Sequence, residues 1–80
     1  MKNKIFVNTG LDDKDKIEFS KLVVANGGTV KSSVVLDTNY VVYNPNYNGE
    51  TTKFKRAKEL KARGKNIKII TFAEWKKLLE

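Results

Sequence analysis

Residues 4–13, Lys-Ile-Phe-Val-Asn-Thr-Gly-Leu-Asp-Asp, contain the transition that decides the fold. The apolar run at its start is typical of a short buried strand, and Thr9-Gly10 is typical of the turn that ends one. The two aspartates predict a helix that runs to about Asn26, because carboxylates suit the positive end of the helix dipole. One of these aspartates is the expected N-cap, and Gly27-Gly28 is the expected helix stop.

The rest of the chain continues this alternation. Apolar and β-branched runs predict three more strands, at residues 29–31, 40–43 and 67–70, and residues 34–36 could extend the pairing. Further helices are expected at residues 53–63, capped by Thr51 or Thr52, and at residues 72–79, capped by Thr71. This order predicts an α/β fold, with a parallel sheet covered by helices on both faces.

Length and composition narrow the class of protein. The chain has 80 residues, which predicts a single domain over residues 1–80. It has no cysteine and no histidine, so thiolate zinc sites, thiol nucleophiles and the commonest general base are absent. We therefore expect a non-catalytic protein with no cofactor, no metal and no catalytic residue. No apolar run is long enough for a membrane span, and no secretory signal is visible, which favours the reducing cytoplasm.

The charge of the chain favours an anionic partner. Sixteen Lys and Arg against nine Asp and Glu give a formal net charge of +7. Half of these basic residues lie between residues 53 and 68, and six of them are candidate contacts to a DNA backbone: Lys55, Arg56, Lys58, Lys61, Arg63 and Lys65. A solvated, lysine-rich helix face is the alternative interpretation of the same tract.

Several motifs, taken in order, resemble the BRCT family over about residues 3–79. They are Thr9-Gly10, Gly27-Gly28, the strand introduced by Thr38-Asn39, Thr51-Thr52-Lys53 with Ala57, and a last helix containing Trp75. The resemblance is closest to the bacterial type found in NAD-dependent DNA ligases and in DNA polymerase III exonuclease subunits. It implies a four-stranded parallel sheet in the order 2-1-3-4 flanked by three helices. It also implies phosphate binding, either on a phosphopeptide or at a DNA 5′ end.

The residues themselves predict a phosphate site at Thr9, Gly10, Lys16 and Lys53. On a helical wheel, Lys53 falls on the inward stripe of its helix, and Lys16 falls within the inward arc set by Phe19, Val23 and Val24. A buried ammonium is costly unless an anion is near, although a lysine stem can also reach out to solvent. With the sheet order above, both helices start at the carboxyl edge of the sheet, at a topological switch point. Where the family has an arginine in the first helix, this chain has Lys16, which lacks the bidentate fork.

Three further candidates are weaker. Residues 31–33, Lys-Ser-Ser, could touch a backbone phosphate or form an ordinary polar loop. Tyr47 is a loop aromatic that could stack on a base. Trp75 is expected in the core.

Two functions follow from these observations. The first is a DNA-binding module of replication or repair, associated with the nucleoid, that holds a phosphate without reading sequence. The second is a module that docks a phosphoprotein in the same place. An enzyme is disfavoured because no nucleotide-binding motif, metal cluster or activated nucleophile is visible, although the chain could be part of a ligase or polymerase subunit.

Overall fold

Four parallel strands form one sheet in the order β2-β1-β3-β4, as predicted. The computed structural model describes residues 3–47 and 51–79. The strands are β1 (Ile5–Thr9), β2 (Thr29–Val30), β3 (Tyr40–Tyr43) and β4 (Lys68–Thr71). The central pair, β1 and β3, is in register over four residues, from Phe6 opposite Tyr40 to Thr9 opposite Tyr43.

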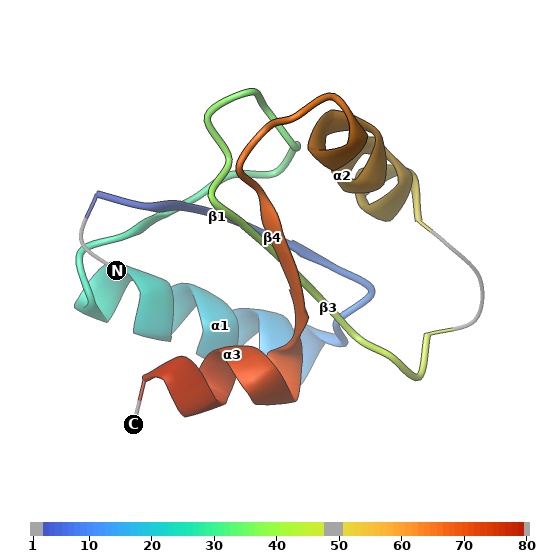
Figure 1. The fold of residues 1–80 in the computed structure, drawn as a ribbon. Helices are drawn as coiled ribbons and strands as arrows, with labels where there is room; N and C mark the ends of the chain where they lie inside the picture. Colours follow the sequence, from blue (N-terminus) through green and yellow to red (C-terminus); the bar gives the residue numbers. More distant parts are fainter. Residues whose placement is uncertain (1–2, 48–50, 80) are drawn as a thin grey trace.

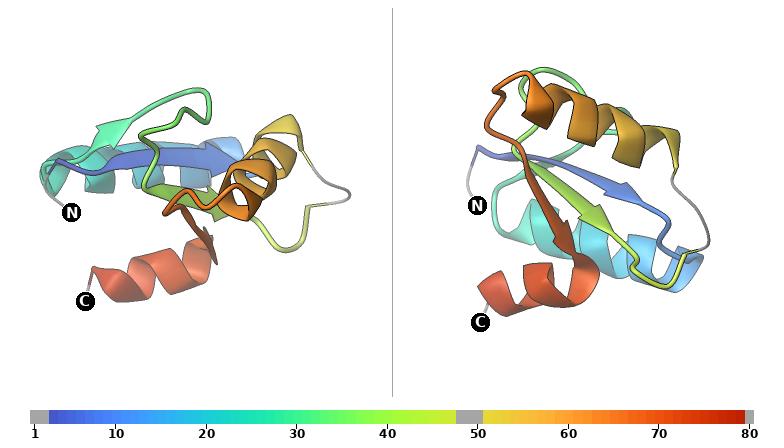
Figure 2. Two further views of the ribbon diagram at one scale, coloured as in Figure 1. Left: turned by 45° about the horizontal axis from the view of Figure 1, so that its top comes forward. Right: turned by 45° about the vertical axis from the view of Figure 1, so that its right-hand side comes forward.

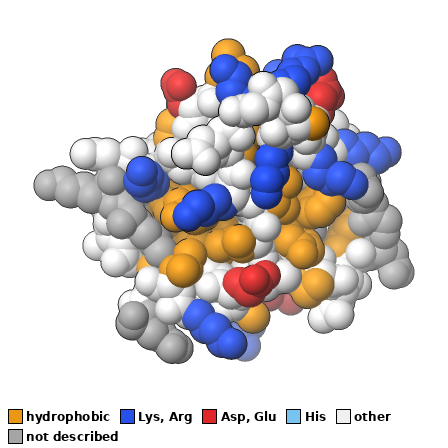
Figure 3. Space-filling model, in the orientation of Figure 1, with side chains coloured by type: hydrophobic (Ala, Val, Ile, Leu, Met, Phe, Trp, Pro, Cys, Tyr) orange, Lys and Arg blue, Asp and Glu red, His pale blue; other side chains and the backbone are white. Residues whose placement is uncertain are grey.

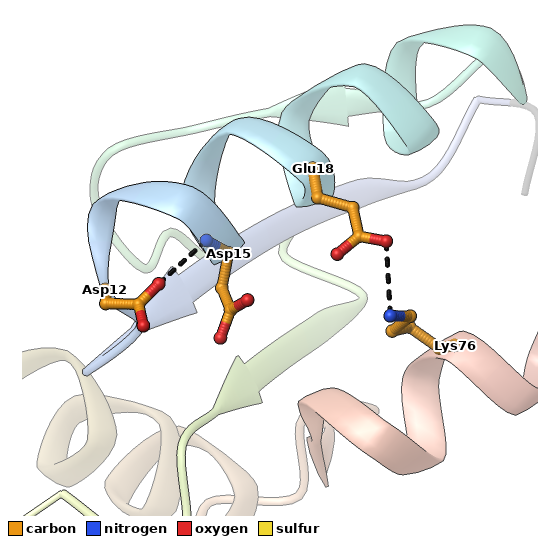
Figure 4. Close-up of polar contacts among 4 residues, drawn as sticks. All are labelled: Asp12, Asp15, Glu18 and Lys76. Carbon is orange, nitrogen blue, oxygen red and sulfur yellow. Dashed lines mark hydrogen bonds and ion pairs between the residues drawn. The ribbon is translucent and has the colours of Figure 1, made fainter.

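Helices cover both faces of the sheet. Helices α1 (Asp13–Ala25) and α3 (Phe72–Leu78) lie on one face, and α2 (Thr52–Ala62) lies on the other (Figures 1 and 2). An ion pair of 3.1 Å between the Lys76 amino group and the Glu18 carboxylate joins α3 to α1 (Figure 4). The α/β class and the strand–helix order predicted from the sequence are therefore confirmed.

Strand alternation divides the core into two layers. On the side of α1 and α3, Phe6 and Val42 pack with Phe19 and Trp75. On the side of α2, the neighbouring strand residues Val7 and Val41 pack with Ala57, Leu60, Val34 and Ile67. Successive strand side chains point to opposite faces, so one pair of short strands contributes to both layers.

Trp75 is the centre of the first layer. It is fully buried, and its ring lies 4.7 Å from the ring of Phe19 and 5.8 Å from that of Phe72, measured between centroids. The prediction that Trp75 is a core residue is confirmed. Aromatic pairs at these distances add to the stabilisation from burial.

The predicted helix caps are confirmed. The Asp12 carboxylate accepts a hydrogen bond from the Asp15 backbone N–H, and Thr51 and Thr71 cap α2 and α3 in the same way. The chain then leaves α1 and α2 through glycines with positive φ, 81° at Gly27 and 88° at Gly64. These local signals explain why the helix boundaries could be predicted to within one or two residues.

Two details of the strands differ from what the sequence suggested. Residues 34–36 form no strand, because Val34 is buried against the α2 side of the sheet while Val35 starts a turn closed by Thr38. The last strand begins at Lys68, one residue after Ile67, whose side chain enters the core before the backbone pairs with β3. In both segments a loop residue buries its apolar side chain in the core. Hydrophobicity alone therefore suggested a longer strand.

Two apolar helix residues are exposed, one of which, Val24, was predicted to face inward. Val24 is 67% exposed and Leu78 is 57% exposed. Val24 follows the buried Val23 by about 100° of helix rotation, which carries it off the face that meets the sheet. In α3, Trp75 and Phe72 already cover the contact with the sheet and α1, and Leu78 lies outside it.

We predict that Gly28→Ala destabilises the protein. A Cβ at this position would lie 2.9 Å from Phe6 Cε1 and 2.9 Å from Val23 Cγ1, both of which are core atoms. We expect the free energy of unfolding, measured by urea titration, to fall by about 1–3 kcal/mol, as for other overpacked cores. Asn66→Ala, at an exposed loop position, is the control and should change stability by less than about 0.5 kcal/mol. An unchanged stability for Gly28→Ala would contradict this packing.

A second prediction concerns Glu74, which completes the capping box of α3. Hydrogen bonds from the Thr71 backbone N–H and from its hydroxyl lower the pKa of Glu74, and Lys77 acts in the same direction. A lowered folded-state pKa gives stability that is present above the ordinary glutamate pKa and is lost as the pH falls through the lowered value. Urea unfolding should show Glu74→Gln less stable than wild type at pH 7, and the difference should shrink as the pH falls below the ordinary pKa of glutamate. A difference independent of pH would exclude a contribution from the charge.

Candidate phosphate site

The candidate site lies at the carboxyl edge of the sheet, where β1 and β3 end side by side. Thr9 pairs with Tyr43 in the last register position of the two strands. From β1 the chain enters α1, and from β3 it passes through a loop into α2, on the opposite face (Figure 1). The two helices therefore start on either side of the same strand ends, which is the geometry of a topological switch point.

All four predicted site residues line one depression at this edge. The depression has a volume of about 280 Å³ and is lined by Asn8, Thr9, Gly10, Lys16, Thr51, Thr52 and Lys53. Gly10 and Lys53, which are 43 positions apart in the sequence, thus line the same depression. This volume can hold a phosphate group together with water.

Thr9 presents a hydroxyl held by the cap of α2. The Thr9 side chain is 5% exposed, and its hydroxyl contacts the hydroxyl of Thr51. The Thr51 oxygen also accepts a hydrogen bond of 3.1 Å from the Phe54 backbone N–H. Thr51 can therefore donate its own proton to Thr9, which leaves the Thr9 proton available for an acceptor in the depression.

Lys53 is half-buried at the first turn of α2. Its Nζ donates a hydrogen bond of 3.3 Å to the Asn8 carbonyl oxygen at the end of β1. An ammonium group has three donors, so this bond positions the charge at the depression and leaves further N–H groups for an anion. The sequence prediction that Lys53 points inward agrees with this position.

Lys16 lines the same depression from its rim. The prediction that Lys16 lies on a buried face was wrong, because its side chain is exposed. Lys16 precedes Phe19 by almost one helical turn, and it lines the depression together with Asn8 and Thr9, at the end of β1. The side chain is therefore free to move towards or away from a ligand.

The starts of the two helices differ in charge. Asp12, Asp13 and Asp15 surround the start of α1, and the Asp12 carboxylate accepts a hydrogen bond of 2.8 Å from the Asp15 N–H (Figure 4). The first turn of α2 contains no acidic residue. Carboxylates already compensate the positive dipole end of α1, so an added anion is favoured at α2.

Comparison with known proteins identifies the family. The sequence model described as BRCA1 C Terminus (BRCT) domain matches residues 1–79. The chain belongs to the BRCT family. It is 36% identical over 80 residues to a DNA ligase of Mycoplasmopsis synoviae (strain 53) and 35% identical over 80 residues to a DNA ligase of Mycoplasmopsis pulmonis (strain UAB CTIP). These matches cover 100% of this chain and only 10% and 11% of the ligases, and no solved structure matches.

The family match confirms the resemblance and the fold predicted from the sequence. BRCT domains are generally non-catalytic, although those similar to this one are parts of DNA ligases. Within residues 3–47 and 51–79, no group of His, Cys, Asp and Glu side chains could hold a metal ion. No helix in the same residues has the length and apolar character to cross a membrane.

The six basic residues predicted to contact a DNA backbone are all exposed on or just after α2 of the BRCT domain. In Figure 3, basic side chains gather over α2 at the upper right. At about 100° per residue, those within the helix and its C-cap spread over about 220° of its circumference. Lys55, Lys58 and Lys61 face one side of the helix, and Arg56 and Arg63 face the other.

Two of these side chains have partners within α2. The Arg63 guanidinium lies 2.8 Å from the Glu59 carboxylate, and the Lys58 amino group lies 5.5 Å from the centre of the Phe54 ring. Both contacts are at the surface, where they contribute little to stability and can be exchanged for a phosphate.

Two other groups that the sequence suggested as nucleic-acid contacts lie in different places relative to the depression. Strand β2 ends beside Phe6, well before Thr9, so Lys31, Ser32 and Ser33 do not line the depression. Tyr47, in contrast, lies directly over Gly10.

Sequence reasoning missed the structural role of Thr51. It was predicted only as a possible helix cap, yet its hydroxyl joins the start of α2 to the end of β1. The sequence Thr51-Thr52-Lys53 could have indicated this role, because it places a helix cap two residues before the lysine of the candidate phosphate site. Asn8 was missed because it contributes its backbone carbonyl. Every residue has this group, so the residue type does not indicate the role.

We predict that Thr51→Val lowers the free energy of unfolding by about 2 kcal/mol, through loss of the helix cap and of the partner of the buried Thr9 hydroxyl. Thr51→Ser retains the hydroxyl and should lose much less. Thermal and urea unfolding of both variants test this expectation. Equal losses for valine and serine would show that the methyl group, rather than the hydroxyl, matters at this position.

Proposed function

We propose that this BRCT domain is a DNA-binding module of replication or repair that holds a terminal 5′ phosphate in the depression at the start of α2. The observation that carries the proposal is the convergence of Thr9, Gly10, Lys16 and Lys53 on one depression of about 280 Å³. DNA ligases as relatives support a role in DNA metabolism, and such binding would place the protein at the nucleoid.

Each residue has a distinct role in the proposed contact. Lys53 supplies a charge at a position fixed by its hydrogen bond to the Asn8 carbonyl. The Thr9 hydroxyl donates a hydrogen bond, and the Gly10 backbone forms part of the wall against which the phosphate lies. Lys16, which is exposed, closes over the ligand from the rim.

Net charge favours DNA over a phosphopeptide as the ligand. A formal charge of +7 and exposed basic residues along α2 suit a polyanion that extends beyond a single phosphate. On this proposal, one side of α2 contacts the DNA backbone through residues such as Lys55, Lys58 and Lys61. Docking of a phosphoprotein in the same depression is the second candidate, since the depression itself recognises only phosphate.

The test is a fluorescence anisotropy titration with matched duplexes that carry or lack a 5′ phosphate. We expect about tenfold tighter binding of the phosphorylated end, the value of one or two charge-assisted hydrogen bonds. Lys53→Ala should remove this preference. If about six backbone phosphates are contacted, affinity for both duplexes should fall on the order of a thousandfold between 50 and 200 mM salt.

Lys77→Ala is the charge-matched control. Lys77 is exposed on α3, on the face of the sheet opposite α2, so its removal lowers the net charge without touching the depression. This variant should retain the preference for a 5′ phosphate. Equal binding of both duplexes by the wild type would refute end recognition, and tight binding of phosphopeptides without binding of DNA would favour the second candidate.

A further inference from the structure

A second, aromatic pocket adjoins the phosphate depression. It has a volume of about 160 Å³ and shares Thr9, Gly10 and Thr51 with the depression, while the rings of Tyr43, Tyr47 and Phe54 form much of its remaining wall. These three shared residues form the boundary between the two cavities. A ligand that fills both must carry a flat or apolar group close to its phosphate.

The pocket is held in place by Asn44, at the end of β3. The Asn44 backbone N–H donates to the Thr9 carbonyl oxygen at 3.3 Å, and its side-chain amide donates to the Gly10 carbonyl oxygen at 3.2 Å. Its side-chain oxygen accepts from the Asn46 N–H at 2.9 Å. One asparagine therefore ties the loop after β3 to the turn after β1, and fixes the wall of the pocket relative to the phosphate depression.

Gly10 lets the Tyr47 ring close over this turn. A Cβ on Gly10 would lie 3.1 Å from Tyr47 Cγ, so the ring occupies space that any other residue would fill. Tyr47 is nevertheless 53% exposed. The Tyr47 backbone N–H donates a hydrogen bond of 3.1 Å to the Asn44 carbonyl oxygen. An exposed aromatic ring beside a phosphate site is suited to stacking on a planar group, because stacking removes its face from water.

We propose that the aromatic pocket accepts the terminal nucleobase of a 5′-phosphorylated DNA strand, with Tyr47 as its stacking surface. This inference rests on the proposed function, since it extends the same site from the phosphate to the first nucleotide. In a nucleotide, one sugar joins the 5′ phosphate to the base, which matches two cavities that share a wall.

Entry of the base into the pocket requires that it leave the end of the duplex. Unpairing and unstacking a terminal base costs free energy, and a base that is already unpaired avoids this cost. The domain is therefore expected to bind a 5′-phosphorylated end with an unpaired terminal nucleotide more tightly than a fully paired end.

The test uses 5′-phosphorylated DNA whose unpaired terminal nucleotide is 2-aminopurine, compared with the same DNA bearing an abasic residue at that position. We expect the wild type to quench 2-aminopurine and to bind it about tenfold more tightly than the abasic end, the value of one stacked base. Tyr47→Ala should lose both the quenching and the tenfold preference, and Tyr47→Phe should keep them. Leu36→Ala, at another exposed apolar residue, is the control and should behave as wild type.

The outcomes separate this inference from the proposed function. A preference for the 5′ phosphate, with equal binding of the base and abasic ends and no effect of Tyr47→Ala, would overturn the inference and leave the proposed function standing. Loss of the phosphate preference itself would overturn both. Binding of phosphopeptides that depends on Tyr47, in the absence of DNA binding, would assign the pocket to an apolar peptide side chain and overturn the inference.

Discussion

The parallel pairing of β1 with β3 is the constraint on which the rest of the structure depends. This register places Thr9 beside Tyr43, so the turns after the two strands leave the sheet at the same edge. The first turn leads to α1 on one face, and the second leads through the loop to α2 on the other. A displacement of one residue in this register would exchange the two layers of the core, because Phe6 and Val7 face opposite sides.

The candidate site is an extension of the contacts that hold this edge together. Thr51 caps α2 and contacts Thr9, Lys53 donates to the Asn8 carbonyl, and Asn44 binds both Thr9 and Gly10 through their carbonyls. Of the groups that stabilise the ends of the strands, Thr51 and Lys53 therefore line the depression, and Asn44 lines the adjoining aromatic pocket. Such a site is preorganised, since a ligand meets side chains already positioned by the fold.

The sequence was sufficient to predict the order of strands and helices, the helix caps and four of the seven residues that line the depression. These features depend on local signals, such as Thr51 before α2, or on the topology of a parallel sheet. The sequence was insufficient to show that Val34 and Ile67 lie outside the strands, because an apolar loop residue buried in the core gives the same sequence pattern as a strand residue. It was also insufficient for Lys16, because a helical wheel gives the direction of a side chain but not whether the sheet extends far enough to cover it.

Charge distribution explains why the two helix starts, although close together, are not equivalent. The Asp12 carboxylate accepts a hydrogen bond from the Asp15 N–H, and the carboxylates of Asp12, Asp13 and Asp15 offset the dipole of α1, while α2 begins with two threonines and Lys53. The potential at the edge of the sheet is therefore asymmetric, favourable to an anion beside α2 and less so beside α1. The aromatic pocket adjoins the depression at Thr9, Gly10 and Thr51, so a nucleotide whose phosphate lies against Lys53 and Thr9 can place its base in the pocket that Phe54 and Tyr47 line.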